Sequence, residues 1–157
     1  MLHHEYKHDP NKVTNKRFSE TAKPMTKAYS TDLGYDLYAD EDSCLRFGVP
    51  TKIKTSIATK FPMGYGGFIK DRSSMASKGF VTVGGVIDPE YIGEISIIML
   101  NLNFSFKDVL FGRKIKKGDK IAQIVPIETK TWDVVVVENL DEENSQRGSK
   151  GFGSSGK

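Results

Sequence analysis

The sequence predicts an all-β protein, a β-sandwich or jelly roll, and three observations support this fold class. Apolar runs rich in Ile and Val recur along the chain, turn residues separate them, and helical periodicity is nearly absent. Short strands joined by Gly, Pro and Asp turns are typical of sandwiches and barrels. A chain of 157 residues with 38% hydrophobic content is large enough to form one domain around a single core.

Four segments carry the strand signals. Residues 51–61, TKIKTSIATKF, alternate with a period of two around Ile53, Thr55, Ile57 and Thr59, which is typical of a half-buried strand. Residues 93–100 and 120–127 are short runs rich in Ile and Val, and residues 132–138, WDVVVVE, are almost entirely β-branched. Turn residues punctuate the chain at 48–50, 61–64, 88–89 and 117–119.

One short helix is predicted within residues 73–79, SSMASKG. Ser73 or Ser74 would cap its N-terminus, because a hydroxyl oxygen can accept hydrogen bonds from the free amides of the first turn. Gly79 would end it, since glycine readily adopts the left-handed conformation that closes many helices.

Composition divides the chain into three predicted parts. Residues 1–22 are polar and form a predicted flexible N-terminal extension, part of which can pair as an edge strand. Residues 23–140 form the predicted β domain. Residues 141–157 become rich in Gly, Ser and Lys, a composition typical of a flexible arm. Phe152 stands between two glycines in this arm, and an aromatic side chain on a flexible segment is suited to closing over a ligand.

Cysteine content, charge and hydropathy limit the cellular compartment of the protein and the classes of partner that it can bind. Cys44 is the single cysteine, so an intrachain disulfide is impossible and a reducing compartment is predicted. The net charge of +3 comes from lysines spread along the chain, which does not indicate a nucleic-acid surface. No apolar run approaches the ~18 residues of a membrane span, and the N-terminus lacks the apolar core of a signal peptide. We therefore expect a soluble protein of the cytoplasm or nucleus that binds neither membrane nor nucleic acid.

Polar side chains that a core does not require gather first in residues 70–77, KDRSSMAS. Arg72 followed by Ser73 and Ser74 at a helix start combines a guanidinium fork with hydroxyl donors, which suits a phosphate group. Gln123 lies within an apolar strand, where an inward amide needs a partner and an outward one would face solvent. Each signal is weak by itself, since an Arg-Ser pair is common.

Two carboxylates occupy positions suited to chemistry. Asp36 lies two residues after Gly34, and a turn between strands is the alternative interpretation. Asp88 precedes Pro89 after an apolar stretch that contains two glycines, and a partly screened carboxylate there is suited to general-base work. Tyr91 could cover the face of a ligand. A β-hairpin with an ordinary Asp-Pro turn explains the same residues without any chemistry.

The order of these stretches resembles the trimeric dUTPase family, the deoxyuridine 5'-triphosphate nucleotidohydrolases. That family has five motifs, A-x-S-x-x-A-G-Y-D-L, P-R-S-S/G, G-V-I-D-x-x-Y-x-G, G-D-R-I-A-Q-L and R-G-x-x-G-F-G-S-T-G. Their counterparts here, in the same order, are AYSTDLGYDL, DRSS, GVIDPEYIG, GDKIAQI and RGSKGFGSSG. The resemblance spans residues 28–156 and is specific, because five motifs must match in order.

The resemblance implies a jelly-roll protein of the dUTPase type that assembles as a homotrimer. Its three active sites would lie at subunit junctions, and a flexible C-terminal arm would be donated to the site of a neighbouring subunit. The implied reaction is hydrolysis of dUTP to dUMP and pyrophosphate with Mg²⁺. That reaction would keep uracil out of DNA and supply dUMP for dTTP synthesis.

The third motif supplies the implied chemistry and base recognition. Similarity to it makes Asp88 the base that activates water for attack on the α-phosphorus. Tyr91 would stack against the deoxyribose and leave no room for a 2′-hydroxyl. The backbone of Gly85, Val86 and Ile87 would read the Watson–Crick edge of uracil. Thymine would then be excluded sterically by its 5-methyl group, and cytosine by its mismatched pattern of hydrogen-bond donors and acceptors.

The first, second and fourth motifs imply a phosphate site. Arg72, Ser73 and Ser74 would hold the phosphate chain, and Gln123 would contribute an amide. Asp36 would support the metal indirectly, through water, while the triphosphate itself holds most of the Mg²⁺ coordination. A magnesium triphosphate already has a good leaving group, so alignment and charge neutralisation would supply most of the catalysis.

The fifth motif implies that the arm is a lid. Arg147 would reach the γ-phosphate and Phe152 would stack on the uracil ring. The amides of Gly153 and Ser154 would approach the phosphates, because the neighbouring glycines leave the backbone bare. Closure of such a lid excludes water and completes the site.

The chain departs from the family pattern at a few positions. Asp71 replaces Pro before the arginine of the second motif and adds a negative charge there, so we expect its side chain to point away and pair with a lysine. Leu33, Lys120 and Ser155 stand in place of Ala, Arg and Thr, and none of these changes removes a group that performs chemistry. Residues 103–115 have no assigned role.

Two rival functions are consistent with the same sequence. A dCTP deaminase, or a bifunctional relative, can use the same fold, but the GVID-x-x-Y hairpin and the complete arm around Phe152 favour dUTP hydrolysis. The other rival is a regulatory dUTPase-like protein whose main task is to bind a partner. Residues 1–22 and 103–115 are the segments where such a partner would bind.

Overall fold

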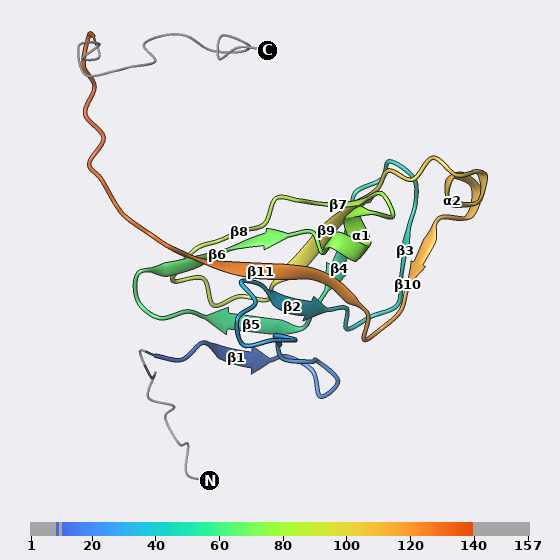
Figure 1. Cartoon of the computed structure of the whole chain (residues 1–157), viewed down its shortest axis with the longest axis horizontal. Helices are drawn as coiled ribbons and strands as arrows, with labels where there is room; N and C mark the ends of the chain where they lie inside the picture. The colour runs from blue at the N-terminus through green and yellow to red at the C-terminus, as the bar shows by residue number, and fades with distance from the viewer. Residues whose placement is uncertain (1–8, 10, 140–157) are drawn as a thin grey trace.

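The computed structural model describes residue 9 and residues 11–139, and in that part of the chain the fold is an all-β sandwich with two short helices (Figure 1). The strands are β1 (Thr14–Arg17), β2 (Tyr35–Tyr38), β3 (Ser43–Leu45), β4 (Thr51–Lys54), β5 (Ile57–Lys60), β6 (Tyr65–Lys70), β7 (Phe80–Val83), β8 (Val86–Ile87), β9 (Ser96–Asn101), β10 (Arg113–Ile115) and β11 (Lys120–Glu128). The helices are α1 (Ser73–Ala76) and α2 (Phe106–Phe111). The predicted all-β fold class is confirmed.

All the strand pairs of the described chain are antiparallel. One sheet has the order β2-β11-β6-β8 and another has the order β4-β9-β7. Two smaller sheets pair β1 with β5 and β10 with β3. Strand β11, the last of the described strands, lies between β2 and β6, so strands that are distant in sequence meet in the middle of one sheet (Figure 1).

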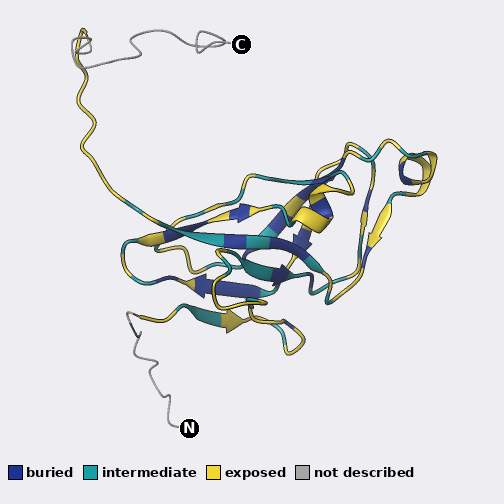
Figure 2. Ribbon diagram, viewed as in Figure 1, coloured by how far each residue is buried: buried dark blue, intermediate teal, exposed yellow. Residues whose placement is uncertain are grey.

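The core is mostly aliphatic, with Phe61 and Phe80 as its aromatic members, and it draws on both larger sheets (Figure 2). Strand β9 shows the expected alternation, because Ile97 and Met99 are buried and Ile98 between them is exposed. Burying one such side chain stabilises a fold by about 1.5–3 kcal/mol. The largest fully buried aliphatic side chains of the two larger sheets are Leu37, Ile53, Ile97, Met99, Ile121 and Ile124.

The segment predicted as one strand at 51–61 is two strands in different sheets. Ser56 interrupts it with a φ of 52°, a left-handed conformation that few residues other than glycine adopt. Its N–H donates to Glu94 Oε1 at 3.0 Å, which supports the corner. Strand β4 then pairs with β9, whereas β5 pairs with β1. The period-two spacing of Ile53, Thr55, Ile57 and Thr59 continues through the corner in the sequence, so periodicity could not reveal the change of sheet.

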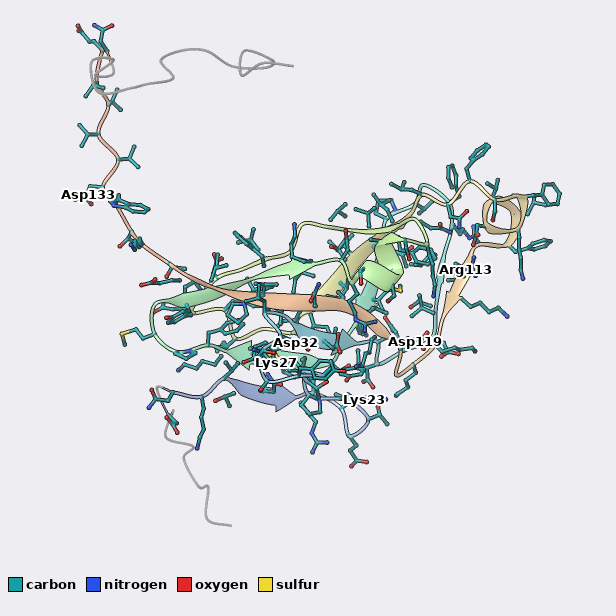
Figure 3. All side chains as sticks on the ribbon, in the orientation of Figure 1. Lys23, Lys27, Asp32, Arg113, Asp119 and Asp133 are labelled. Atoms are coloured by element: carbon teal, nitrogen blue, oxygen red, sulfur yellow. The ribbon has the colours of Figure 1, made fainter. Side chains whose placement is uncertain are left out.

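The prediction of a strand at 132–138 is wrong for the single chain. These residues form no strand, and Trp132, Val134 and Val136 are 78%, 93% and 93% exposed. Figure 3 shows the segment around Asp133 leading away from the body of the fold with its side chains uncovered. A β-branched run needs a neighbouring strand for its backbone hydrogen bonds, and the described part of the chain places none beside it.

The predicted short helix is present, but its cap differs from the prediction. Arg72 occupies the N-cap position with an extended backbone and no side-chain capping bond, so the prediction of Ser73 or Ser74 as cap is wrong. Both serines instead form the first turn of α1. Gly79 follows the helix as predicted, with a φ of 79° and its N–H donating to Ala76 O at 2.9 Å.

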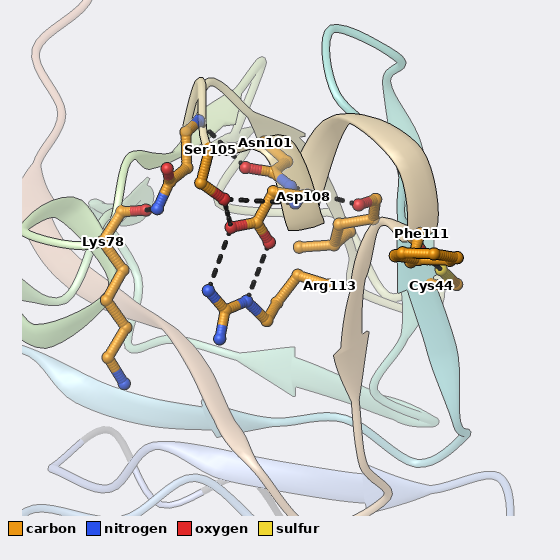
Figure 4. Close-up of polar contacts among 9 residues, drawn as sticks. Cys44, Lys78, Asn101, Ser105, Asp108, Phe111 and Arg113 are labelled. Carbon is orange, nitrogen blue, oxygen red and sulfur yellow. Dashed lines mark hydrogen bonds and ion pairs between the residues drawn. The ribbon is translucent and has the colours of Figure 1, made fainter.

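Helix α2 lies in the connection between β9 and β10, within residues 103–115, for which the sequence indicated no role. Ser105 caps it, because its Oγ accepts from the Asp108 N–H at 3.1 Å. Arg113 donates to both carboxylate oxygens of Asp108, each at 3.0 Å (Figure 4). The hydrogen bonds from Arg113 and then Ser105 hold the pKa of Asp108 below its usual range. This buried carboxylate therefore ties the helix to β10.

The outer side of α2 is apolar and uncovered, with Phe106, Leu110 and Phe111 mostly exposed. At the start of the connection between β9 and β10, the Leu102 N–H donates to Gly79 O at 2.8 Å, just beyond α1. An apolar surface presented on a firmly held helix is typical of an interaction site. None of the described helices has the length and hydropathy needed to cross a membrane.

Polar contacts join the segment after β1 to the sandwich. The edge strand foreseen near the N-terminus is present, since β1 pairs with β5. Asp40 accepts hydrogen bonds from Ser19 Oγ at 2.5 Å and Thr21 Oγ1 at 2.8 Å, and Lys117 Nζ lies 3.2 Å from it. Burial of this side chain, which is 7% exposed, opposes its ionisation. The surrounding hydroxyl and ammonium groups outweigh burial and hold the pKa of Asp40 well below its usual range.

We predict that Asp40 makes the fold sensitive to acid. Because its pKa is lower in the folded chain than the ordinary ~3.9, the unfolded chain binds the proton first, and stability falls as pH drops below about 4. Asp40→Asn should lower the free energy of unfolding at neutral pH by about 2 kcal/mol and flatten this acid limb. Urea unfolding at a series of pH values measures both effects. Glu90→Gln, at an exposed site, is the control, and an equally steep acid limb in Asp40→Asn would contradict the assignment.

Candidate active site

The residues of the third motif surround a hollow of about 360 Å³. It lies where the loop after β8 faces strands β4 and β9. All five residues predicted from this motif line it, namely Gly85, Val86, Ile87, Asp88 and Tyr91. The other lining residues are Lys52, Glu94, Ile95 and Ser96. The structure therefore brings the predicted base and the predicted base-recognition loop together.

Gly85 allows the hairpin to lie directly against β6. Its φ of 92° is in the left-handed region, and a Cβ at this position would lie 2.7 Å from the Cβ of Ile69. The Ile69 N–H donates to Gly85 O at 2.7 Å, and Ile87 pairs with Gly67, two residues earlier in β6. Because Gly85 has no side chain, a ligand in the hollow can approach the peptide groups of this turn.

Asp88 and Tyr91 occupy one turn at the rim of the hollow. The Tyr91 N–H donates to Asp88 O at 3.1 Å, and the Tyr91 hydroxyl donates to Glu94 O at 3.0 Å. These two bonds hold the aromatic ring in place while 44% of the residue stays exposed. Asp88 is exposed, and among the described residues no group donates a hydrogen bond to its carboxylate. The carboxylate is thus available to a water molecule.

Arg72 belongs to a cluster of charges beyond the other end of β6. Its Nε donates to Asp36 Oδ1 at 2.7 Å, and Lys120 Nζ lies 2.6 Å from Asp36 Oδ2. The Arg72 Nη1 also donates to Ser74 Oγ at 3.4 Å. The hydrogen bond to Asp36 raises the pKa of Lys120 above its ordinary value. One carboxylate thus faces two cations, and the excess positive charge beside the exposed hydroxyls of Ser73 and Ser74 suits a polyanion.

Gln123 faces inward and has the partner that an inward amide requires. Its Nε2 donates to Asp71 O at 2.8 Å. Gly34 makes room for this side chain, because a Cβ on Gly34 would collide with Gln123 Oε1. The glycine of the first motif and the glutamine of the fourth are therefore a packed pair, and Gln123 supports the loop that precedes Arg72.

Asp71 points away from the Arg72 cluster as expected, but the prediction of a lysine partner is wrong. Its Oδ1 accepts from the Thr82 N–H at 2.6 Å and from Thr82 Oγ1 at 2.7 Å. Strand β7 brings these two donors to the end of β6, a proximity that no local pattern in the sequence indicates.

The predicted base, Asp88, and the predicted phosphate-binding residue Arg72 lie far apart in one chain. Ile87 pairs with Gly67, which places Asp88 beside Gly66 near the start of β6. Arg72 comes after the last residue of the same strand. The extended chain from Gly66 to Arg72 spans roughly 20 Å. A single chain therefore does not bring the predicted base to the predicted phosphate site.

A family model described as dUTPase matches residues 20–156. The chain belongs to the dUTPase family. Two relatives, both named deoxyuridine 5'-triphosphate nucleotidohydrolase, come from rat and from Kluyveromyces lactis. The rat protein is 37% identical over 145 residues, which cover 90% of this chain and 65% of the relative. The yeast protein is 40% identical over 141 residues, which cover 88% of this chain and 90% of the relative.

Solved structures of dUTPases share the fold. The dUTPase of Staphylococcus bacteriophage 80alpha with dUpNHpp has a TM-score of 0.84 and 33% sequence identity, and the match covers 93% of this chain and 99% of that chain. A variant dUTPase of phage phi11 of S. aureus, described with a structural Mg(II) ion, has a TM-score of 0.74 and 27% identity, with coverage of 83% and 99%. The likeness extends over nearly the whole sandwich.

The described residues of this dUTPase-family chain provide no ready cage for a metal. In residue 9 and residues 11–139, no group of three or more His, Cys, Asp or Glu side chains is placed to hold an ion. Asp36 has one carboxylate oxygen bonded to Arg72 and the other to Lys120. Asp36 does not fit as a direct metal ligand, and support of the metal through water stays a prediction.

The arm of the dUTPase motif is beyond the part of the chain that the structure describes. The predicted residues concerned are Arg147, Phe152, Gly153 and Ser154. Sequence reasoning missed three polar residues of the hollow, Lys52, Glu94 and Ser96. No local signal marks them, because they reach the hollow only when β4 pairs with β9 and the loop after β8 folds over this pair.

Proposed function

We propose that the chain hydrolyses dUTP to dUMP and pyrophosphate. The observation that supports this most is the hollow in which Asp88 and Tyr91 flank the bare backbone at Gly85. A flat base fits against exposed peptide groups, a sugar fits against an aromatic ring, and a solvent-facing carboxylate can activate water. The reaction would keep uracil out of DNA and supply dUMP for dTTP synthesis.

Asp88 would act as the general base. Its carboxylate would accept a proton from a water molecule as the water oxygen attacks the α-phosphorus. The bond from the α-phosphorus to its bridging oxygen would break, and pyrophosphate would leave. The exposed and unbonded carboxylate supports this role, since a base must be open to the water that it deprotonates. Holding the water in line with the leaving group would supply much of the rate gain.

The hairpin would select the nucleotide. Peptide groups at Gly85, Val86 and Ile87 would pair with the Watson–Crick edge of uracil, and cytosine presents a different pattern of donors and acceptors. The 5-methyl group of thymine would be excluded sterically by this tight hairpin. The ring of Tyr91, fixed by its hydroxyl bond to Glu94, would cover the deoxyribose and exclude a 2′-hydroxyl.

The Arg72 cluster would hold the phosphates. Its ion pair fixes Arg72 through Nε, and Nη2 has no partner among the described residues, so this end of the guanidinium is available to an anion. The hydroxyls of Ser73 and Ser74 would add two donors. Gln123 would contribute an amide through the Nε2 hydrogen that its bond to the preceding loop leaves unused.

Magnesium would enter as part of the substrate, magnesium dUTP, with the triphosphate oxygens as its main ligands. There it would neutralise phosphate charge. Asp36 would support it only through water, because both of its oxygens already face cations. A related phage enzyme is described with a structural Mg(II) ion, which is consistent with a role for this metal in the family.

We further propose a homotrimer whose sites lie at subunit junctions. Because Asp88 and Arg72 lie roughly 20 Å apart in one chain, a site that uses both must take them from two copies. The uncovered residues 132–137 support the same assembly, since a β-branched segment without a neighbour can pair with another chain. The segment leads away from its own sandwich in Figure 1, as an arm donated to a neighbour would.

The arm would close over the bound nucleotide. Arg147 would reach the γ-phosphate, Phe152 would stack on uracil, and the amides of Gly153 and Ser154 would face the phosphates. This proposal rests on the family motif and on the outward course of the chain that precedes the arm. Lid closure would exclude water other than the attacking molecule.

Substrate selection and the role of Asp88 are tested in one assay. With Mg²⁺ present, we expect pyrophosphate and dUMP from dUTP and no turnover of dCTP, dTTP or UTP. Asp88→Asn should reduce turnover by at least about 100-fold, because the general base is lost, while dUpNHpp binding is largely kept. Glu90→Gln, two residues away, is the matched control. Ammonia release from dCTP, or full turnover by Asp88→Asn, would contradict the proposal.

Mixed assemblies test the junction sites. Arg72→Ala and Asp88→Asn should each be nearly inactive as pure proteins that still trimerise. After the two are unfolded together and refolded in equal amounts, about a quarter of the sites should have both groups intact, because each group is intact in half of the chains. Recovered activity measures this fraction, and no recovery would place the site within one chain.

The same experiment places the arm. A chain ended at Gln146 should form the trimer but turn over dUTP slowly, and refolding with Asp88→Asn should restore activity if neighbours donate arms. Loss of the trimer in the shortened chain would make the arm structural instead.

A second candidate function, binding of a partner protein, is favoured by the exposed apolar side of α2. Phage dUTPases related to this chain are described as controlling transfer of virulence genes by a G protein-like mechanism. We expect Phe106→Ser with Leu110→Ser to keep turnover within about twofold, as surface substitutions usually do, and to abolish retention of any partner in affinity capture. Val49→Ser is the control. Loss of turnover or of the trimer in the double variant would assign this surface to the enzyme itself.

A further inference from the structure

Asp71 lies next to the phosphate-binding residues and differs in chemical type from the family motif, because it is a carboxylate where the motif has a proline. A negative charge beside a triphosphate site is unfavourable, so its presence needs a structural reason. The side chain provides one, because both of its hydrogen bonds go to Thr82 on β7, at 2.6 and 2.7 Å.

The backbone of Asp71 is held as firmly as its side chain. Its carbonyl accepts the hydrogen bond from Gln123 Nε2 at 2.8 Å, which links the loop to β11. The residue therefore connects three strands, since it follows β6 directly, bonds to β7 through its carboxylate and bonds to β11 through its carbonyl. Arg72 and the first turn of α1 come immediately after it.

We propose that Asp71 is a positioning residue that fixes the phosphate-binding turn by hydrogen bonds, in place of the conformational restraint that proline provides in the family motif. Proline fixes a turn because its ring restricts φ. An aspartate has no such restraint, so this chain fixes the same corner through Thr82. The corner in turn determines where Arg72 leaves the sheet to meet Asp36 and where Ser73 and Ser74 present their hydroxyls.

The residue before Asp71 meets the requirement of the family proline. A proline requires an extended residue before it, and Lys70 is the last residue of β6. Asparagine would keep an oxygen that can accept both hydrogen bonds from Thr82 and would remove the negative charge. Alanine would keep neither the restraint nor the hydrogen bonds. These three substitutions at Asp71 therefore separate geometry from charge.

Steady-state kinetics with dUTP tests the proposal, which rests on the proposed function. Asp71→Ala removes both hydrogen bonds to Thr82 and should raise KM by at least about tenfold, the effect of losing a single charge-assisted hydrogen bond, with a smaller change in kcat. Asp71→Pro and Asp71→Asn should keep KM within about threefold of the wild type, since each preserves the corner. Thr82→Val removes one of the two donors and should raise KM less than Asp71→Ala does, whereas Thr82→Ser keeps both donors and is the matched control.

Hydrogen exchange gives a readout that does not depend on activity. The amides of Met75, Ala76 and Ser77 bond back to Arg72 and Ser73, so a loosened corner should speed their exchange in Asp71→Ala but not in Asp71→Pro. If Asp71→Ala matched the wild type in both KM and exchange, or if Asp71→Pro behaved like Asp71→Ala, the proposal would be wrong. If the wild type did not hydrolyse dUTP, the proposed function would fail, while the exchange comparison would still decide the role of Asp71.

Discussion

The antiparallel pairing of β6 with both β11 and β8 is the constraint on which the rest of the candidate site depends. Pairing with β8 brings the hairpin of Gly85 to one part of the strand, and pairing with β11 brings Gln123 to Lys70 at its end. An extended strand has a fixed rise per residue, so Asp88, beside Gly66, stays roughly 20 Å from Arg72 within one chain. A fold of this kind can complete such a site only by association.

Three carboxylates hold other parts of the structure in position. Asp36 binds two cations and so holds Arg72 in one position without cancelling the positive charge that would attract a triphosphate. Asp40 and Asp108 are different, because each is nearly buried and each ties a peripheral segment to the sandwich. A buried carboxylate is costly unless its partners are in place, so these two act as fixed points for the N-terminal segment and for α2.

Much of the site could be predicted because the role of each motif residue follows from its neighbours in the sequence. A glycine pair before an Asp-Pro turn indicates a bare, tight hairpin, and the structure places Gly85, Asp88 and Tyr91 around one hollow. The packing of Gly34 against Gln123 could not be predicted, although both residues belong to recognised motifs. That contact joins the residue just before β2 to a residue of β11, and only the pairing of these two strands brings them together.

The sequence by itself determined the all-β class, the family and the identity of the chemical groups, because alternation, turn residues and ordered motifs depend on residues close together in the chain. Tertiary structure decided where the groups meet. It divided residues 51–61 between two sheets at Ser56 and left residues 132–138 without a partner strand. It also made Thr82, and not a lysine, the hydrogen-bond partner of Asp71. Each of these outcomes depends on which strands become neighbours, and hydrogen bonding between strands distant in sequence leaves no periodic trace along the chain.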